Sequence, residues 1–70
     1  MIRPGRYRHY KGNDYEVIGI ARNSETEEEM VVYRKLYGDC SLWVRPLAMF
    51  MEDVTVDGQR IPRFAYLGEK

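Results

Sequence analysis

Turn-forming residues divide this chain into short segments, and that division limits its fold more than any other feature. Pro4-Gly5, the Lys-Gly-Asn-Asp run at 11–14 and Asp57-Gly58 are the clearest breaks. The segments between them are rich in Val, Ile, Tyr and Trp, and no apolar stripe of helical period lasts three turns. The sequence therefore predicts a mostly β fold built from short strands.

Five or six strands follow from these breaks. Asp57-Gly58 predicts a tight hairpin, and Pro46 predicts one short helical turn over residues 46–50. Gly19 lies in mid-strand, where a bulge or a close packing contact would use it, and Pro62 marks the last strand as an edge. The expected architecture is a small, strongly bent, SH3-like barrel. The predicted strands are residues 6–10, 15–21, 30–37, 42–45, 54–56 and 59–67.

The composition of this chain excludes two common sources of stability for small domains, a disulfide and a structural zinc site. Its 70 residues make a single domain, 1–70, with an ordered core expected over about 4–67. Cys40 and His9 are the only Cys and His, so neither an internal disulfide nor a four-ligand zinc site can form. A chain this short buries only about 60% of its unfolded surface. We therefore expect most of the six Tyr, two Phe and one Trp to form the core. Self-association is the other way in which the chain could compensate for its small buried surface.

The sequence also indicates the net charge of the chain and the cellular compartment to expect for it. Eleven basic and eleven acidic residues cancel, so the chain as a whole does not attract phosphate or anionic lipid strongly. We find no leader-like segment and no apolar run long enough to cross a membrane. An unpaired Cys fits a reducing compartment. We expect a bacterial-type cytoplasmic protein without a membrane partner.

The residues that commonly perform catalysis are isolated from one another. His9 would need an orienting partner and a pocket to act as a general base, and no spacing selects one. Cys40 lies in a Gly-Asp-Cys-Ser turn without a feature that would activate its thiol. A glycine-rich phosphate loop is also missing. We expect no catalytic residue, no metal ligand and no cofactor.

Two groups of residues remain as candidates for binding. Residues 6–11 interleave cations and rings, as a platform for single-stranded nucleic acid does. The second group comes from the third and fourth strands, where rings and arginines could hold a peptide or a modified side chain. In both groups the alternative is that the rings belong to the core. The candidate binding residues are Arg6, Arg8, His9, Tyr10, Arg34, Tyr37, Trp43 and Arg45.

Several sequence motifs appear together and in order. They include Val-Val-Tyr-Arg at 31–34 and Pro-Arg-Phe at 62–64, and the most specific are Tyr-Arg-His-Tyr-Lys-Gly at 7–12 and Trp-Val-Arg-Pro-Leu at 43–47. Over residues 4–67 the chain resembles the bacterial family called domain of unknown function 1653. The resemblance implies a small, stand-alone bacterial protein and assigns no activity.

These observations favour a non-enzymatic binding module. Its aromatic and arginine surface would hold a peptide, a protein or a nucleic-acid strand. The alternative is a small accessory subunit that docks on a larger bacterial protein or self-associates through an edge strand, for example as a homodimer. An enzyme is the third hypothesis, and it would require a pocket in which His9 meets a carboxylate.

Overall fold

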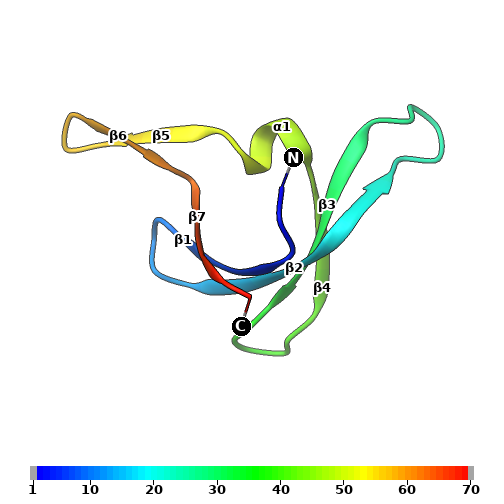
Figure 1. Cartoon of the computed structure of the whole chain (residues 1–70), viewed down its shortest axis with the longest axis horizontal. Coiled ribbons are helices and arrows are strands. Elements are labelled where there is room, and N and C mark those ends of the chain that lie inside the picture. The colour runs from blue at the N-terminus through cyan, green and yellow to red at the C-terminus, as the bar shows by residue number, and fades with distance from the viewer. Residues whose placement is uncertain (1, 70) are drawn as a thin grey trace.

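The computed structural model describes residues 2–69 and contains seven strands and one short helix in that range (Figure 1). The mostly β fold and the helical turn after Pro46 are therefore confirmed. In chain order the elements are β1 Gly5–His9, β2 Asp14–Arg22, β3 Glu29–Lys35, β4 Leu42–Pro46, α1 Leu47–Phe50, β5 Asp53–Val56, β6 Gln59–Pro62 and β7 Phe64–Gly68.

The strands form one large antiparallel sheet and one separate hairpin. The large sheet has the order β4-β3-β2-β1-β7, and β5 pairs only with β6. Within the described residues the ladder ends at β4 and β7, so the sheet is open and a closed SH3-like barrel stays a prediction. Figure 1 shows the sheet curving around the middle of the molecule, with the β2–β3 and β5–β6 hairpins projecting to opposite sides.

The expected single strand over residues 59–67 was wrong, because the chain bends at Arg63. The Arg63 N–H donates to the Glu52 carbonyl at 3.0 Å, and the Arg63 carbonyl accepts from the Tyr10 N–H at 2.9 Å. These bonds turn the backbone away from the β5–β6 hairpin. Pro62 ends β6, and β7 then joins β1 in the large sheet.

Two local predictions from glycine are confirmed by the backbone. Asp57 and Gly58 have φ angles of 51° and 79°, as a two-residue hairpin turn requires. The pairing of β2 with β3 shifts between Val17 and Gly19, which places a bulge there. No heavy atom lies within 4 Å of the position of a Cβ on Gly19, so the bulge and not close packing explains this residue.

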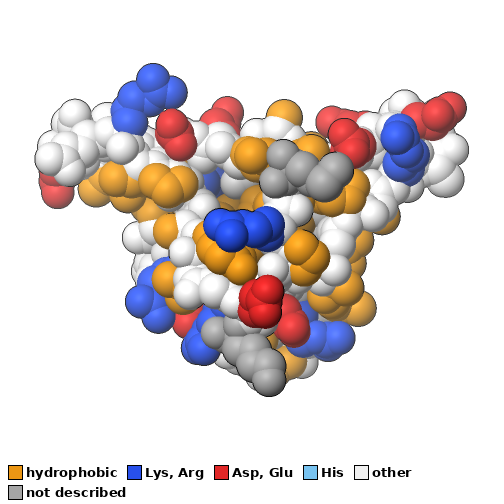
Figure 2. Space-filling model, viewed as in Figure 1, with side chains coloured by type: hydrophobic (Ala, Val, Ile, Leu, Met, Phe, Trp, Pro, Cys, Tyr) orange, Lys and Arg blue, Asp and Glu red, His pale blue; other side chains and the backbone are white. Residues whose placement is uncertain are grey.

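The core lies on the concave face of the large sheet. Side chains alternate between the two faces of each strand, and the buried ones come from every strand of this sheet except β4. Phe50 reaches this core from α1 and stacks parallel on Phe64, with 4.0 Å between ring centroids. The buried hydrophobic residues are Tyr7, Val17, Val31, Tyr33, Phe50 and Phe64. Figure 2 shows hydrophobic side chains also exposed between charged groups of both signs.

We predict that Phe50→Ala lowers the free energy of unfolding by about 3–5 kcal/mol, because the ring is only 1% exposed and its loss leaves a cavity. Urea denaturation followed by Trp fluorescence measures this loss. Phe50→Leu should give a smaller loss of the same sign if the Ala variant does not fold. Met49→Ala, next to it on α1 but 48% exposed, is the control. An equal effect of the two Ala substitutions would contradict this account of the core.

Candidate basic-aromatic site

Strand alternation separates the eight predicted binding residues onto different surfaces. Trp43 and Arg45 pair with buried Tyr33 and Val31, which places both on the concave side of the sheet. His9 comes two residues after buried Tyr7 on β1, so its side chain lies on the same concave side of the sheet. By contrast, Arg6, Arg8 and Arg34 lie on the opposite face, and Tyr10 and Tyr37 lie in turns. The predicted set is therefore not one site.

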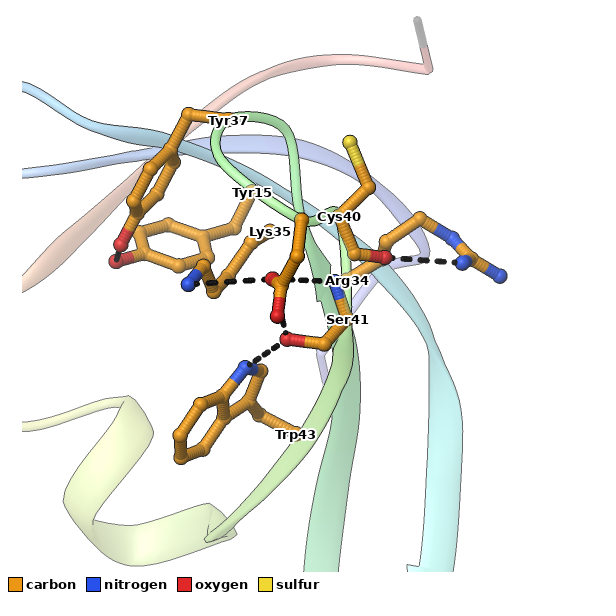
Figure 3. A network of polar contacts seen from close by, with 8 residues as sticks. Tyr15, Arg34, Lys35, Tyr37, Cys40, Ser41 and Trp43 are labelled. Atoms are coloured by element: carbon orange, nitrogen blue, oxygen red, sulfur yellow. Dashed lines mark hydrogen bonds and ion pairs between the residues drawn. The ribbon is translucent and has the colours of Figure 1, made fainter.

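The arginines on the opposite face are occupied within the chain. Asp14 forms ion pairs with Arg8 at 2.7 Å and with Arg6 at 3.1 Å. Hydrogen bonding from Arg8 is the main reason why the pKa of Asp14 lies below its ordinary value. Arg34 donates to the Cys40 carbonyl at 3.3 Å (Figure 3). These contacts stabilise turns and leave less charge for a ligand.

Trp43 is held in a fixed orientation although it is 51% exposed. Its Nε1–H donates to the Ser41 Oγ at 2.8 Å, and the Ser41 hydroxyl donates to the Asp39 Oδ1 at 2.9 Å. Asp39 also forms an ion pair with Lys35 at 3.4 Å (Figure 3). A chain of polar contacts therefore presents the indole ring to solvent in one position.

Tyr15 and Tyr37 form the side of the site next to Trp43. Their hydroxyls lie 2.6 Å apart and share a hydrogen bond. The Lys35 Nζ lies 4.9 Å from the centroid of the Tyr37 ring and 5.8 Å from that of Trp43. Burial, and then the bond to Tyr37, raise the pKa of Tyr15 to about 12. The Tyr15 hydroxyl is therefore neutral at physiological pH.

His9 and two arginines form the other side. The His9 ring lies edge-on to Phe64 at 4.9 Å between centroids, and the Arg45 Cζ lies 5.8 Å from the Phe64 centroid. Burial is the main reason why the pKa of His9 lies below its ordinary value. The positive charges of Arg45, Arg63 and Lys11 lower it further. We define the basic-aromatic site as His9, Tyr15, Lys35, Tyr37, Trp43, Arg45 and Arg63.

Sequence reasoning missed three residues of this site. Lys35 was detectable, because it follows Val31 and Tyr33 on one face of a strand by simple alternation. Tyr15 required knowledge that β2 pairs with β3, which brings it opposite Lys35. Arg63 was missed because the sequence predicted one continuous strand over 59–67, without the bend that occurs at this residue.

Residues 2–69 contain no cluster of three or more His, Cys, Asp or Glu side chains arranged to hold a metal ion. In the same range, no helix has the length and apolar character needed to span a bilayer.

Comparison with known proteins decides the family. Residues 5–66 match the family model described as protein of unknown function, DUF1653. The chain belongs to the DUF1653 family. It is 44% identical to a DUF1653 protein from Bordetella bronchiseptica, whose crystal structure it matches with a TM-score of 0.91 over 99% of this chain and 91% of that chain. No curated protein matches this DUF1653 chain. The resemblance noted in the sequence is thus confirmed, and the family assigns no activity.

We predict that Tyr37→Phe lowers the pKa of Tyr15 from about 12, because the variant removes the hydrogen bond between the two hydroxyls. The pKa should stay above 10.0, since burial is the larger cause. Ultraviolet titration of the tyrosines measures the change, and Tyr10→Phe is the control. An unchanged late-titrating tyrosine in Tyr37→Phe would contradict the assignment.

The same shift predicts how stability depends on pH. The pKa of Tyr15 is higher in the folded chain than its ordinary value of 10.0, so its contribution is fully present below pH 10. That contribution should be lost as the pH rises from 10 toward 12. Urea denaturation at several pH values measures it, and the loss should shrink in Tyr37→Phe.

Proposed function

We propose that this DUF1653 protein is a non-enzymatic binding module that holds a segment of a partner protein on its basic-aromatic site. The observation that carries the proposal is Trp43, whose ring is half exposed and yet fixed by its bond to Ser41. Trp, Tyr and Arg are the residues that contribute most binding energy at protein interfaces. A ring that is already ordered loses little entropy when a ligand covers it.

The distribution of charge favours a protein segment over a nucleic-acid strand. Nucleic-acid binding draws most of its affinity from several phosphate contacts. Here the chain has no net charge, and Arg6 and Arg8 are already paired with Asp14. On the concave side, Arg45 has no acidic partner within residues 2–69, while Lys35 and Arg63 are each paired with one acid, Asp39 and Glu52. This arrangement supports recognition of a compact ligand group rather than a long row of phosphates.

The surroundings of His9 support a role other than catalysis. Its Nδ1 accepts the Lys11 N–H at 3.2 Å, so one ring nitrogen is used by a turn. Its charged neighbours are cations, and a general base of this kind is usually oriented by a carboxylate. We therefore propose binding rather than reaction.

Selection of peptides from a displayed library, followed by NMR titration of the best binders, tests this function. We expect shifts at Tyr37, Trp43 and Arg45, and Trp43→Ala should weaken binding by about thirtyfold, the effect of losing an interface hot spot of ~2 kcal/mol. Trp43→Phe should retain part of the affinity. The matched surface control is Met51→Ala, because Met51 is 55% exposed and lies outside the site.

Two results would overturn the proposal. One is that the shifts concentrate on the opposite face around Arg6, Arg8 and Arg34. The other is that single-stranded oligonucleotides bind at physiological salt more tightly than any selected peptide.

A second candidate function is docking or self-association through the β4 edge. Leu42, Trp43 and Val44 are 54%, 51% and 58% exposed, although they are consecutive apolar residues of a strand. The Lys35 N–H donates to the Ser41 carbonyl, so these two residues form a hydrogen-bonded pair at the end of the β3–β4 ladder. Hydrogen-bonded and non-hydrogen-bonded pairs alternate along an antiparallel ladder, so the backbone N–H and C=O groups of Leu42 and Val44 point away from β3. An apolar edge strand with free backbone groups is a template for pairing with another chain.

We predict that, if this edge is used, the chain forms a dimer whose sedimentation depends on concentration. Val44→Lys should shift the equilibrium to the monomer, because a charged side chain on an edge strand opposes pairing. Leu67→Lys, on the strand at the other edge of the sheet, is the control with 45% exposure. A monomer at every concentration, with no change in Val44→Lys, would rule out self-association.

A further inference from the structure

Two arginine nitrogens lack the partner that burial normally requires. Within residues 2–69, the Nε atoms of Arg45 and Arg63 are the buried side-chain nitrogen or oxygen atoms without a hydrogen bond. Nearly all buried polar atoms in proteins have a partner, and an exception commonly marks the place of a bound ion or water. Both exceptions here are of the same chemical kind.

The two nitrogens belong to one place in the fold. The charges of Arg45 and Arg63 both act on His9, and both residues lie beside Phe64, Arg63 as its neighbour in sequence and Arg45 with its Cζ at 5.8 Å from the ring centroid. They come from different elements, since Arg45 is on β4 and Arg63 joins β6 to β7. The charges of both arginines therefore act at one place, beside His9.

The charges around this place do not balance. The Arg63 Nη2 lies 2.9 Å from the Glu52 Oε1, which leaves its Nε unpaired. Arg45 has no acidic partner within the described residues, and its contact is with the Phe64 ring. A half-buried guanidinium without an anion is costly, and an anion of the right geometry would offset that cost.

We propose that Arg45 and Arg63 together bind a carboxylate, the acidic side chain of the partner segment, over Phe64 and His9. The proposal rests on the proposed function and names the group that the basic-aromatic site recognises. The Arg45 guanidinium presents its Nε–H and one Nη–H side by side, which matches the two oxygens of a carboxylate, and Arg63, whose Nη2 is paired with Glu52, adds its Nε–H. Trp43, on the same face of β4, would then contact the residues that flank the acid.

A single carboxylate fits the place better than a nucleic-acid phosphate backbone. The unpaired donors are two, both on arginines whose charges act on His9, whereas Arg6, Arg8 and Arg60 are paired with Asp14 or Asp53 on other surfaces. A strand of phosphates would need further free cations along its path.

The chemistry also predicts a change at His9. The groups that face it are Tyr15 from β2, Arg45 from β4, Arg63 before β7, and Tyr10 and Lys11 from the adjacent turn. None of these is an acid, so a bound carboxylate would add the missing negative charge. That charge would raise the pKa of His9, and binding would strengthen as the pH falls through the raised value.

His9 is the one histidine of the chain, so its proton NMR signal reports on the site directly. The probes are sodium acetate, inorganic phosphate, a short blocked peptide with one Glu, its Gln counterpart and an oligothymidylate, each matched in ionic strength with sodium chloride. We expect acetate to raise the pKa of His9 by about one unit at saturation. The Glu peptide should do the same and the Gln peptide should not.

The variants are chosen to separate charge from geometry. Arg45→Gln should abolish the response of His9 to acetate and weaken the Glu peptide by about ten- to a hundredfold, the loss of a charge-assisted hydrogen-bonded contact. Arg45→Lys should keep a reduced response, because it retains the charge without the paired donors. Arg60→Gln, an exposed arginine paired with Asp53, is the control and should behave as wild type.

Each alternative result has a defined meaning. The inference is overturned if acetate leaves the pKa of His9 unchanged, or if Arg45→Gln binds the Glu peptide as tightly as wild type. Selected peptides that still bind through Trp43 in that variant would preserve the proposed function alone. A response to phosphate and oligothymidylate without one to acetate would replace the carboxylate by a nucleic-acid phosphate and overturn both.

Discussion

The parallel stacking of Phe50 on Phe64 is the contact on which the rest of this fold depends. It joins the helical turn that follows β4 to the strand at the opposite edge of the sheet, with 4.0 Å between ring centroids. Tyr7 and Tyr33 then contact Phe50 at 5.5 Å and 5.6 Å from strands in between. A chain without a disulfide thus draws both ends of its sheet together with aromatic rings, which bury more area than other side chains.

Local chemistry explains the part of the fold that could be predicted from the sequence. Asp57-Gly58 and Pro46 act within a few residues of themselves, so the hairpin and the helical turn followed directly. The bend at Arg63 could not be predicted, because it depends on backbone bonds to Glu52 and Tyr10, residues that are distant in sequence.

The site was predicted less completely than the fold for the same physical reason. Trp43 and Arg45 were identified by their side-chain chemistry, and two-residue spacing puts them on one face. Tyr15 lies 22 residues from Tyr37, and only the pairing of β2 with β3 brings their hydroxyls together. Composition grouped Arg8 with His9, whereas the pleat of β1 sends these neighbours to opposite faces.

Phe64 belongs to the core and also contacts the basic-aromatic site. One face of its ring stacks on Phe50, while its surroundings on the site side are His9 and the Arg45 guanidinium. The charged groups are therefore fixed against a ring that cannot move without disturbing the core. A rigid surface of this kind loses little conformational entropy on binding, so a ligand of modest size can be held. It also follows that a substitution at Phe50 would make the site less rigid, although Phe50 contacts no ligand in this arrangement.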